Sequence, residues 1–179
     1  QQGRMWLLWP KGRPLPPVGP GVAPANGAAA NLALQPVLDA LSRSTGRRFL
    51  VAKSVPEQLR GGTLDLSNPT WPQLLALLRN NGLAAVKIEG ITNIVPDGPM
   101  REYPLPVVTQ DDAAVADDEW VTRTIVLKAG NADQFVRTLR PLVPQNGFLA
   151  ASPDNRALVL VDRYGNTRRL IEVLRSMEK

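Results

Sequence analysis

Acidic residues in two short runs are the first candidates for chemistry in this sequence. One run is Asp111-Asp112, and the other is Asp117-Asp118-Glu119. Grouped carboxylates could hold a divalent cation, because Ca²⁺ and Mg²⁺ prefer oxygen ligands. A calcium loop, however, places Asp, Asn, Gly and Glu at fixed intervals, and neither run has that spacing. The sequence therefore predicts no metal site here.

Catalytic side chains are scarce in this chain. Among its 179 residues there is no histidine and no cysteine, so acid–base chemistry would fall to Asp, Glu, Lys or Tyr. No phosphate-binding glycine loop, nucleophile elbow or metal-ligand spacing occurs in the sequence. We therefore expect a protein that is not an enzyme, with no catalytic residue and no cofactor. The lack of cysteine excludes disulfides but fits either cytosol or periplasm.

Basic residues dominate outside one segment. The formal net charge is +5, yet residues 97–119 hold seven acids and a single base, so the rest of the chain is more basic than the total suggests. A basic surface could bind phosphates, anionic lipid or an acidic protein. The simpler interpretation is a set of scattered, solvated side chains. Four arginines gather around the expected last helix: Arg163, Arg168, Arg169 and Arg175.

Two amphipathic helices are expected between residues 31 and 95. Gly46 ends the first helix, and the second opens with the capping-box pattern of Thr70 and Gln73 and ends at Gly82. Apolar residues recur in both at the spacing that puts them on one helical face. These faces are Leu34, Val37, Leu38 and Leu41 in the first helix, and Trp71, Leu74, Leu75 and Leu78 in the second.

Strand signals surround these helices. Residues 49–51 form a short apolar run, and residues 84–88 and 91–95 flank Glu89-Gly90, a tight-turn pair that predicts a hairpin. Residues 63–66 alternate polar and apolar side chains, which predicts a strand with one buried face. We expect that strand to be a sheet edge that binds a protein partner, although a central strand is the alternative. Its residues are Thr63, Leu64, Asp65 and Leu66.

A second module is expected from about Trp120 to Lys179. A β-branched run at residues 121–127 predicts a strand, and Asn131 with Gln134 caps a helix that Pro141 bends or ends. Residues 148–151 and 157–161 flank turn residues and predict a hairpin. A final helix carries Leu170, Val173, Leu174 and Met177 on one face. The order β-α-β-β-α completes a fold of the α+β class built from two small modules.

Composition divides the chain into four parts. Residues 1–24 hold six prolines and are expected to form a flexible arm, and residues 25–96 form the first module. Residues 97–119 are expected to be a mobile acidic linker before the second module at 120–179. No apolar run approaches the roughly 20 residues of a membrane span. Residues 5–9 are too short for a signal-peptide core, so we expect any targeting segment to be already removed.

The β-α-β-β-α order is similar to the RNA-binding KH fold. KH modules clamp the nucleic-acid backbone with a Gly-x-x-Gly loop, whereas the second module has only the separate Gly130, Gly147 and Gly165. We therefore expect no nucleic-acid partner. A KH-like nucleic-acid-binding protein is kept as an alternative.

Several short segments of both modules match a known family pattern. Those in the first module are LDALSRSTG (38–46), GGTLDL (61–66), TW (70–71), LLALLRNNGL (74–83) and IVP (94–96). Those in the second are IVLK (125–128), NAD (131–133), LRPL (139–142) and DNRALVLVD (154–162). Both modules, in this order, resemble the periplasmic N-terminal modules of secretins, the outer-membrane channels of type II secretion. The first is similar to the short N-terminal domain that secretins share with TonB-dependent receptors, and the second is similar to the KH-like secretin repeat.

The resemblance implies a non-enzymatic part of an outer-membrane secretin, located in the periplasm, that forms a homo-oligomeric vestibule ring. The first module would meet the inner-membrane platform subunit and secreted substrate proteins, and the second would pack between subunits. We expect Arg163, Arg168, Arg169 and Arg175 to contribute to these inter-subunit contacts. The resemblance also implies that the chain is the N-terminal part of a longer protein. A signalling domain of a TonB-dependent receptor is the alternative, but it would share only the first module.

Overall fold

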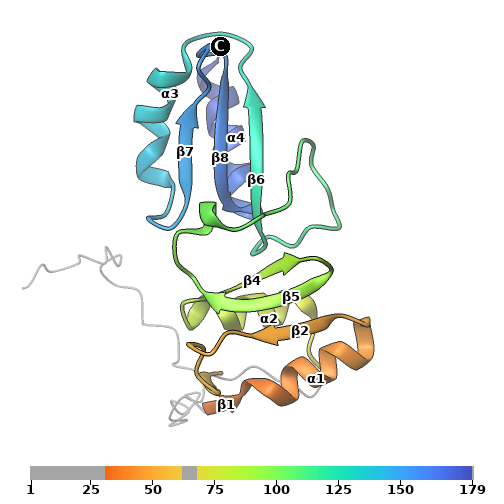
Figure 1. The fold of residues 1–179 in the computed structure, drawn as a ribbon. Helices are drawn as coiled ribbons and strands as arrows, with labels where there is room; N and C mark the ends of the chain where they lie inside the picture. The colour runs from red at the N-terminus through yellow and green to blue at the C-terminus, as the bar shows by residue number, and fades with distance from the viewer. Residues whose placement is uncertain (1–30, 62–67, 179) are drawn as a thin grey trace, which may run out of the picture.

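The computed structural model describes residues 31–61 and 68–178, and it confirms a mixed α+β fold built from two stacked modules (Figure 1). The first module pairs β1 with β3 in a small antiparallel sheet and has a second sheet of order β2-β5-β4. In that second sheet β2 runs parallel to β5, and β4 runs antiparallel to it. The elements are β1 (Asn31–Ala33), α1 (Leu34–Thr45), β2 (Arg48–Val51), β3 (Gln58–Arg60), α2 (Trp71–Asn80), β4 (Leu83–Ile88) and β5 (Ile91–Pro96).

Local sequence signals explain the two helices of the first module. All four residues of the predicted face of α1 are buried, and the helix ends at Gly46, whose φ of 69° suits glycine. The capping box of α2 is confirmed, because Gln73 accepts a hydrogen bond of 2.8 Å from the backbone N–H of Thr70. Leu77 is buried in addition to the predicted Leu74, Leu75 and Leu78.

The predicted hairpin joins β4 to β5. Glu89 and Gly90 both have positive φ, 49° and 79°, which is the backbone of the type I′ turn that matches strand twist. Two three-residue strands, β1 and β3, are additions that the sequence did not predict, since such short strands carry no periodicity. The predicted arm (1–24), residues 25–30 and the strand of residues 63–66 lie outside the described residues.

The second module has the predicted β-α-β-β-α order, with its sheet in the order β6-β8-β7 and all pairs antiparallel. Asn131 caps its first helix by accepting from the N–H of Asp133, at 2.9 Å, and not through a box with Gln134. Met177 was expected on the apolar face of the last helix but is 40 % exposed, because the buried face turns toward Thr167 and Ile171. The elements are β6 (Trp120–Val126), α3 (Ala132–Leu139), the 3-10 turn η2 (Arg140–Leu142), β7 (Phe148–Ala151), β8 (Ala157–Arg163) and α4 (Tyr164–Met177).

Each module has an apolar core of its own. The core of the first module lies between α1, α2 and the sheets, with Leu38, Leu41 and Leu74 fully buried. The core of the second lies between α3, α4 and the sheet and includes Leu158 and Leu170. Within the described residues, no helix combines the length and the apolar character that crossing a membrane requires.

The segment between the modules is packed, whereas its composition predicts a mobile linker. It contains the short 3-10 helix η1 (Met100–Glu102), and Met100 is fully buried. Val108 donates its backbone N–H to Thr122, at 2.9 Å, which attaches the segment to the outer side of β6. A third apolar cluster, here called the seam, joins the two modules through this segment. Its buried residues are Ala84, Val86, Val95, Met100, Leu105, Trp120 and Val161.

Candidate functional site

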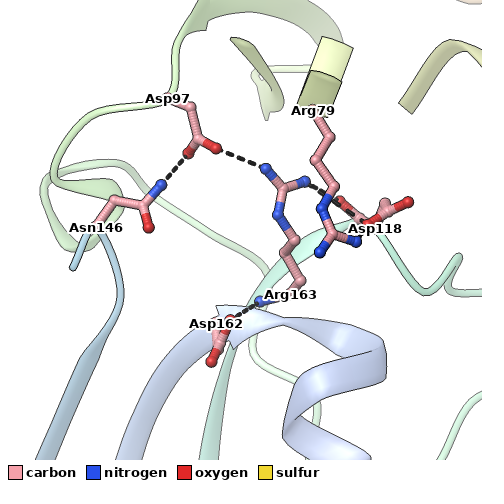
Figure 2. A network of polar contacts seen from close by, with 6 residues as sticks. All are labelled: Arg79, Asp97, Asp118, Asn146, Asp162 and Arg163. Atoms are coloured by element: carbon pink, nitrogen blue, oxygen red, sulfur yellow. Dashed lines mark hydrogen bonds and ion pairs between the residues drawn. The ribbon is translucent and has the colours of Figure 1, made fainter. Parts of the chain in front are cut away.

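Charged side chains from both modules meet beside the seam, in what is called here the module junction. Figure 2 shows its members, which come from α2, from the segment after β5, from the loop before β7 and from the end of β8. They are Arg79, Asp97, Asp118, Asn146, Asp162 and Arg163. These residues line a cleft of about 780 Å³ between the modules.

Arg163 is the central cation of the junction. Its guanidinium donates to the carboxylate of Asp97 at 2.6 Å and to the backbone carbonyl of Asp118 at 3.2 Å. The side chains of Arg163 and Asp97 are each only 11 % exposed, so their ion pair is largely shielded from water. On its other side the guanidinium lies over the ring of Trp120, 5.1 Å from the ring centroid. Arg163 therefore links the second module both to Asp97 and to the seam.

Asp97 is fixed to both modules. Its backbone N–H donates to the carbonyl of Gly82 in the first module, at 2.8 Å. Its carboxylate accepts from Asn146 of the second module at 2.6 Å, in addition to the bond from Arg163. Arg79, in the last turn of α2, reaches across the junction to Asp118 at 2.7 Å, but this pair is more exposed and contributes less.

The start of α4 docks on the same segment. Tyr164 and Gly165 donate their backbone N–H groups to the carbonyls of Glu119 and Asp117, at 2.7 and 2.9 Å. A Cβ at position 165 would lie 3.0 Å from the Cβ of Asp117, so any other residue there would have to displace Asp117 by a few tenths of an ångström. The acidic segment is thus held to the second module by backbone bonds as well as by charges.

Burial raises the pKa of two carboxyl groups at the junction. The pKa of Asp97 lies above its ordinary value of 3.8 because desolvation outweighs the attraction of Arg163 and the bond from Asn146. The pKa of Asp162 is also raised by desolvation, although its carboxylate accepts bonds from Asn166 and from the N–H of Arg163. Keeping these two carboxylates charged therefore lowers the stability of the folded state, because burial removes their hydration.

A pH dependence of stability follows from the raised pKa of Asp97. As pH rises from about 3.8 through the raised value, the folded state binds more protons than the unfolded state, so the free energy of unfolding falls. We predict that the stability of the native chain relative to an Asp97→Asn variant declines over this range and is constant above it. Urea unfolding of both proteins across pH measures the difference. A difference that grows with pH would contradict the assignment.

The four arginines predicted between subunits differ in their surroundings. Arg163 is engaged within the chain at the junction, so its side chain is not free for a neighbouring subunit. Arg168 forms an ion pair with Asp117 and lies 5.2 Å from the ring centroid of Tyr164. Arg169 and Arg175 are exposed, and for them the inter-subunit role stays a prediction. The partner-binding prediction for Thr63, Leu64, Asp65 and Leu66 concerns residues outside the described part of the chain.

Trp71 contacts both the first core and the segment between the modules. Its ring is half-buried against the first core and is stacked by Arg47, at 4.1 Å from the ring centroid. Its indole N–H donates to the carboxylate of Glu119 at 2.6 Å. The helical spacing that predicts a core position for Trp71 contains no signal for this second bond, because Glu119 is far away in the sequence.

The bond between Trp71 and Glu119 can be tested by a double-mutant cycle. Trp71→Phe removes the indole N–H together with part of the ring, and loss of the bond itself should lower the free energy of unfolding by about 1.5 kcal/mol, the lower end of the range for a bond to a charged group, since both residues are half-buried. Glu119→Ala removes the acceptor. Chemical unfolding of both single variants and the double variant gives the coupling. Additive effects would show that the bond contributes nothing.

The chemistry of the junction is that of a positioning site. Among the described residues no group of histidine, cysteine or acidic side chains is arranged to hold a metal ion. Asp97 and Asp118 are engaged by arginines, and Asp162, which also lines the cleft, accepts bonds from Asn166 and from the N–H of Arg163. What the arrangement does is hold one small module in a defined orientation to another.

Known proteins show the same pair of modules. No known family model matches this chain. The secretin XcpQ of Pseudomonas aeruginosa is 28 % identical over 145 residues, which are 79 % of this chain and 21 % of XcpQ. The Klebsiella pneumoniae type II secretion system outer membrane complex, with PulD, PulS and the PulC HR domain, matches 86 % of this chain and 26 % of that one with a TM-score of 0.68 at 19 % identity. A crystal structure of the N-terminal domain of XcpQ covers 84 % of this chain and 64 % of its own, at 26 % identity and a TM-score of 0.33.

The chain is thus similar to secretins, and its two α+β modules are held together at a charged junction. The chain is homologous to the N-terminal part of the secretin XcpQ. It spans about a fifth of the length of that relative. The predicted resemblance to secretins is thereby confirmed.

Proposed function

We propose that this chain is the periplasmic part of an outer-membrane secretin of type II protein secretion, where it forms part of the vestibule ring and docks the inner-membrane platform and secreted proteins. The observation that carries the proposal is the homology to XcpQ, which spans most of this chain. The fold shared with the Klebsiella pneumoniae type II secretion system outer membrane complex, at a TM-score of 0.68, supports it. The proposed role is non-enzymatic.

The module junction gives this role a physical basis. A vestibule ring needs subunits whose modules keep one orientation, because each module must meet its neighbour at the same place in every copy. The ion pair between Arg163 and Asp97 and the packed seam supply such an orientation. A TonB-dependent receptor would share the first module only, so the presence of the second favours the secretin.

Binding to the platform subunit tests the proposal. The full chain should form a saturable complex with the periplasmic domain of an inner-membrane platform subunit of type II secretion. The control is the same titration with a short single-stranded oligonucleotide at low and moderate salt, since nucleic-acid binding would weaken steeply with salt. Oligonucleotide binding without platform binding would favour the KH-like alternative and overturn the secretin proposal.

A further inference from the structure

The free edge of the three-stranded sheet in the first module has an unusual surface. β2 lies at the edge of the order β2-β5-β4. Of its residues, Leu50 is 55 % exposed and Val51 is 41 % exposed. Large apolar side chains on an edge strand are a liability unless something covers them. The other edge strand, β4, is contacted by β6 of the second module.

The backbone of β2 has groups available for pairing. In parallel strands, alternate residues direct both N–H and C=O toward the partner strand. Ala52, directly after β2, donates its N–H to Ile94 of β5 at 2.9 Å, so Leu50 also faces β5, whereas Phe49 and Val51 face outward. Within the described part of the chain, β5 is the one strand paired with β2, and no turn or loop backbone bond reaches Phe49 or Val51.

The charges around β2 indicate what the edge could accept. Between Arg43 and Pro56 the sequence has four bases and no acid: Arg43, Arg47, Arg48 and Lys53. Pairing of β2 with β2 of a second copy would bring the same cations together, and like charges opposite each other destabilise a sheet. An acidic strand would instead be attracted.

A partly apolar pocket continues the edge beyond Val51. It has a volume of about 570 Å³ and lies between the end of β2, the loop before β3 and the start of α1. Its apolar walls include Val51, Val55 and Leu34, and its polar walls include Lys53 and Glu57. A strand that extended past the end of β2 would have room there for an apolar side chain.

We propose that the outer edge of β2 is a docking site for an extended segment of a protein partner in which apolar residues alternate with acids. The segment would add as a further strand beside β2, bonding to the backbone of Phe49 and Val51. Its apolar side chains would lie on the face of Phe49 and Val51 and enter the pocket, and its carboxylates, on the opposite face, would meet Arg48 beside Leu50. This surface is distinct from the module junction and goes beyond the proposed secretin role.

Amide hydrogen exchange tests the edge directly in the full chain. In the free protein the N–H groups of Phe49 and Val51 should exchange quickly, while those of Leu50 and Ala52, which face β5, should be protected. The probe is a synthetic peptide of alternating Val and Glu. It should slow exchange at Phe49 and Val51, and a matched peptide of alternating Val and Lys should not.

Two variants separate binding from folding. Val51→Pro removes an outward N–H that makes no bond to β5. The protein should therefore stay folded but no longer bind the peptide of alternating Val and Glu. Leu50→Asp places a carboxylate at an exposed position, where it repels the glutamates of the peptide. It should weaken peptide binding several-fold without lowering the melting temperature. Protection of Phe49 and Val51 in the free chain would overturn the proposal, as would equal binding of both peptides or unchanged binding by Leu50→Asp. Each result is independent of whether the chain binds the platform subunit.

Discussion

Arg163→Met is expected to lower the free energy of unfolding by about 3 kcal/mol, the lower end of the range for breaking a buried ion pair from one side. The variant keeps most of the apolar stem of the side chain but leaves the carboxylate of Asp97 without its counter-ion, at a position where that side chain is 11 % exposed. It also removes the donor to the carbonyl of Asp118. Urea or thermal unfolding of the full chain measures the effect.

A second substitution provides the control for Arg163. Asp97→Asn alone should cost less than Arg163→Met, because burial already raises the pKa of Asp97 and so disfavours its charge. The double variant, Asp97→Asn with Arg163→Met, should recover part of the loss, since no uncompensated carboxylate is left. If the double variant were as unstable as the sum of the two single variants, the pair would not be coupled. Arg163 would then act through its packing on Trp120 and its bond to the carbonyl of Asp118.

Much of each module could be predicted from local sequence. The face from Leu34 to Leu41, the box of Thr70 and Gln73 and the turn at Glu89-Gly90 are signals between residues a few positions apart, and the structure confirms all three. The order of the second module was predicted for the same reason. The strands β1 and β3 were missed, because three residues are too few for a period to appear.

The junction could not be predicted, because its contacts join residues far apart in the sequence. Asp97 and Arg163 are separated by 66 positions, and neither lies in a recognisable motif. Acids without apolar periodicity suggest a solvated, mobile segment. In the structure these acids instead find arginines: Asp111 pairs with the buried Arg123, and Asp117 pairs with Arg168. The imbalance between an acidic segment and a basic chain was the one available signal of such pairing.

The second large effect is expected at the seam. Trp120 is 3 % exposed and packs with Met100 and Val86, so it contributes to the apolar contact between the modules and belongs to neither module's own core. Trp120→Ala should cost about 3 to 5 kcal/mol, the range for deleting a large buried aromatic side chain. The lost free energy should come mainly from the contacts that couple the two modules. We therefore expect two unfolding transitions in the variant where the native chain has one.

Limited proteolysis distinguishes a loosened seam from a collapsed module. The native chain should resist cleavage between residues 97 and 108, where Met100, Leu105 and Val108 are buried, and Trp120→Ala should become sensitive there while both modules survive as fragments. Leu158→Ala is the matched control, because Leu158 is fully buried in the second core. That variant should destabilise the second module itself and yield only a fragment of the first. If Trp120→Ala gave the same pattern as Leu158→Ala, Trp120 would belong to the second core, and the seam would not be what holds the modules together.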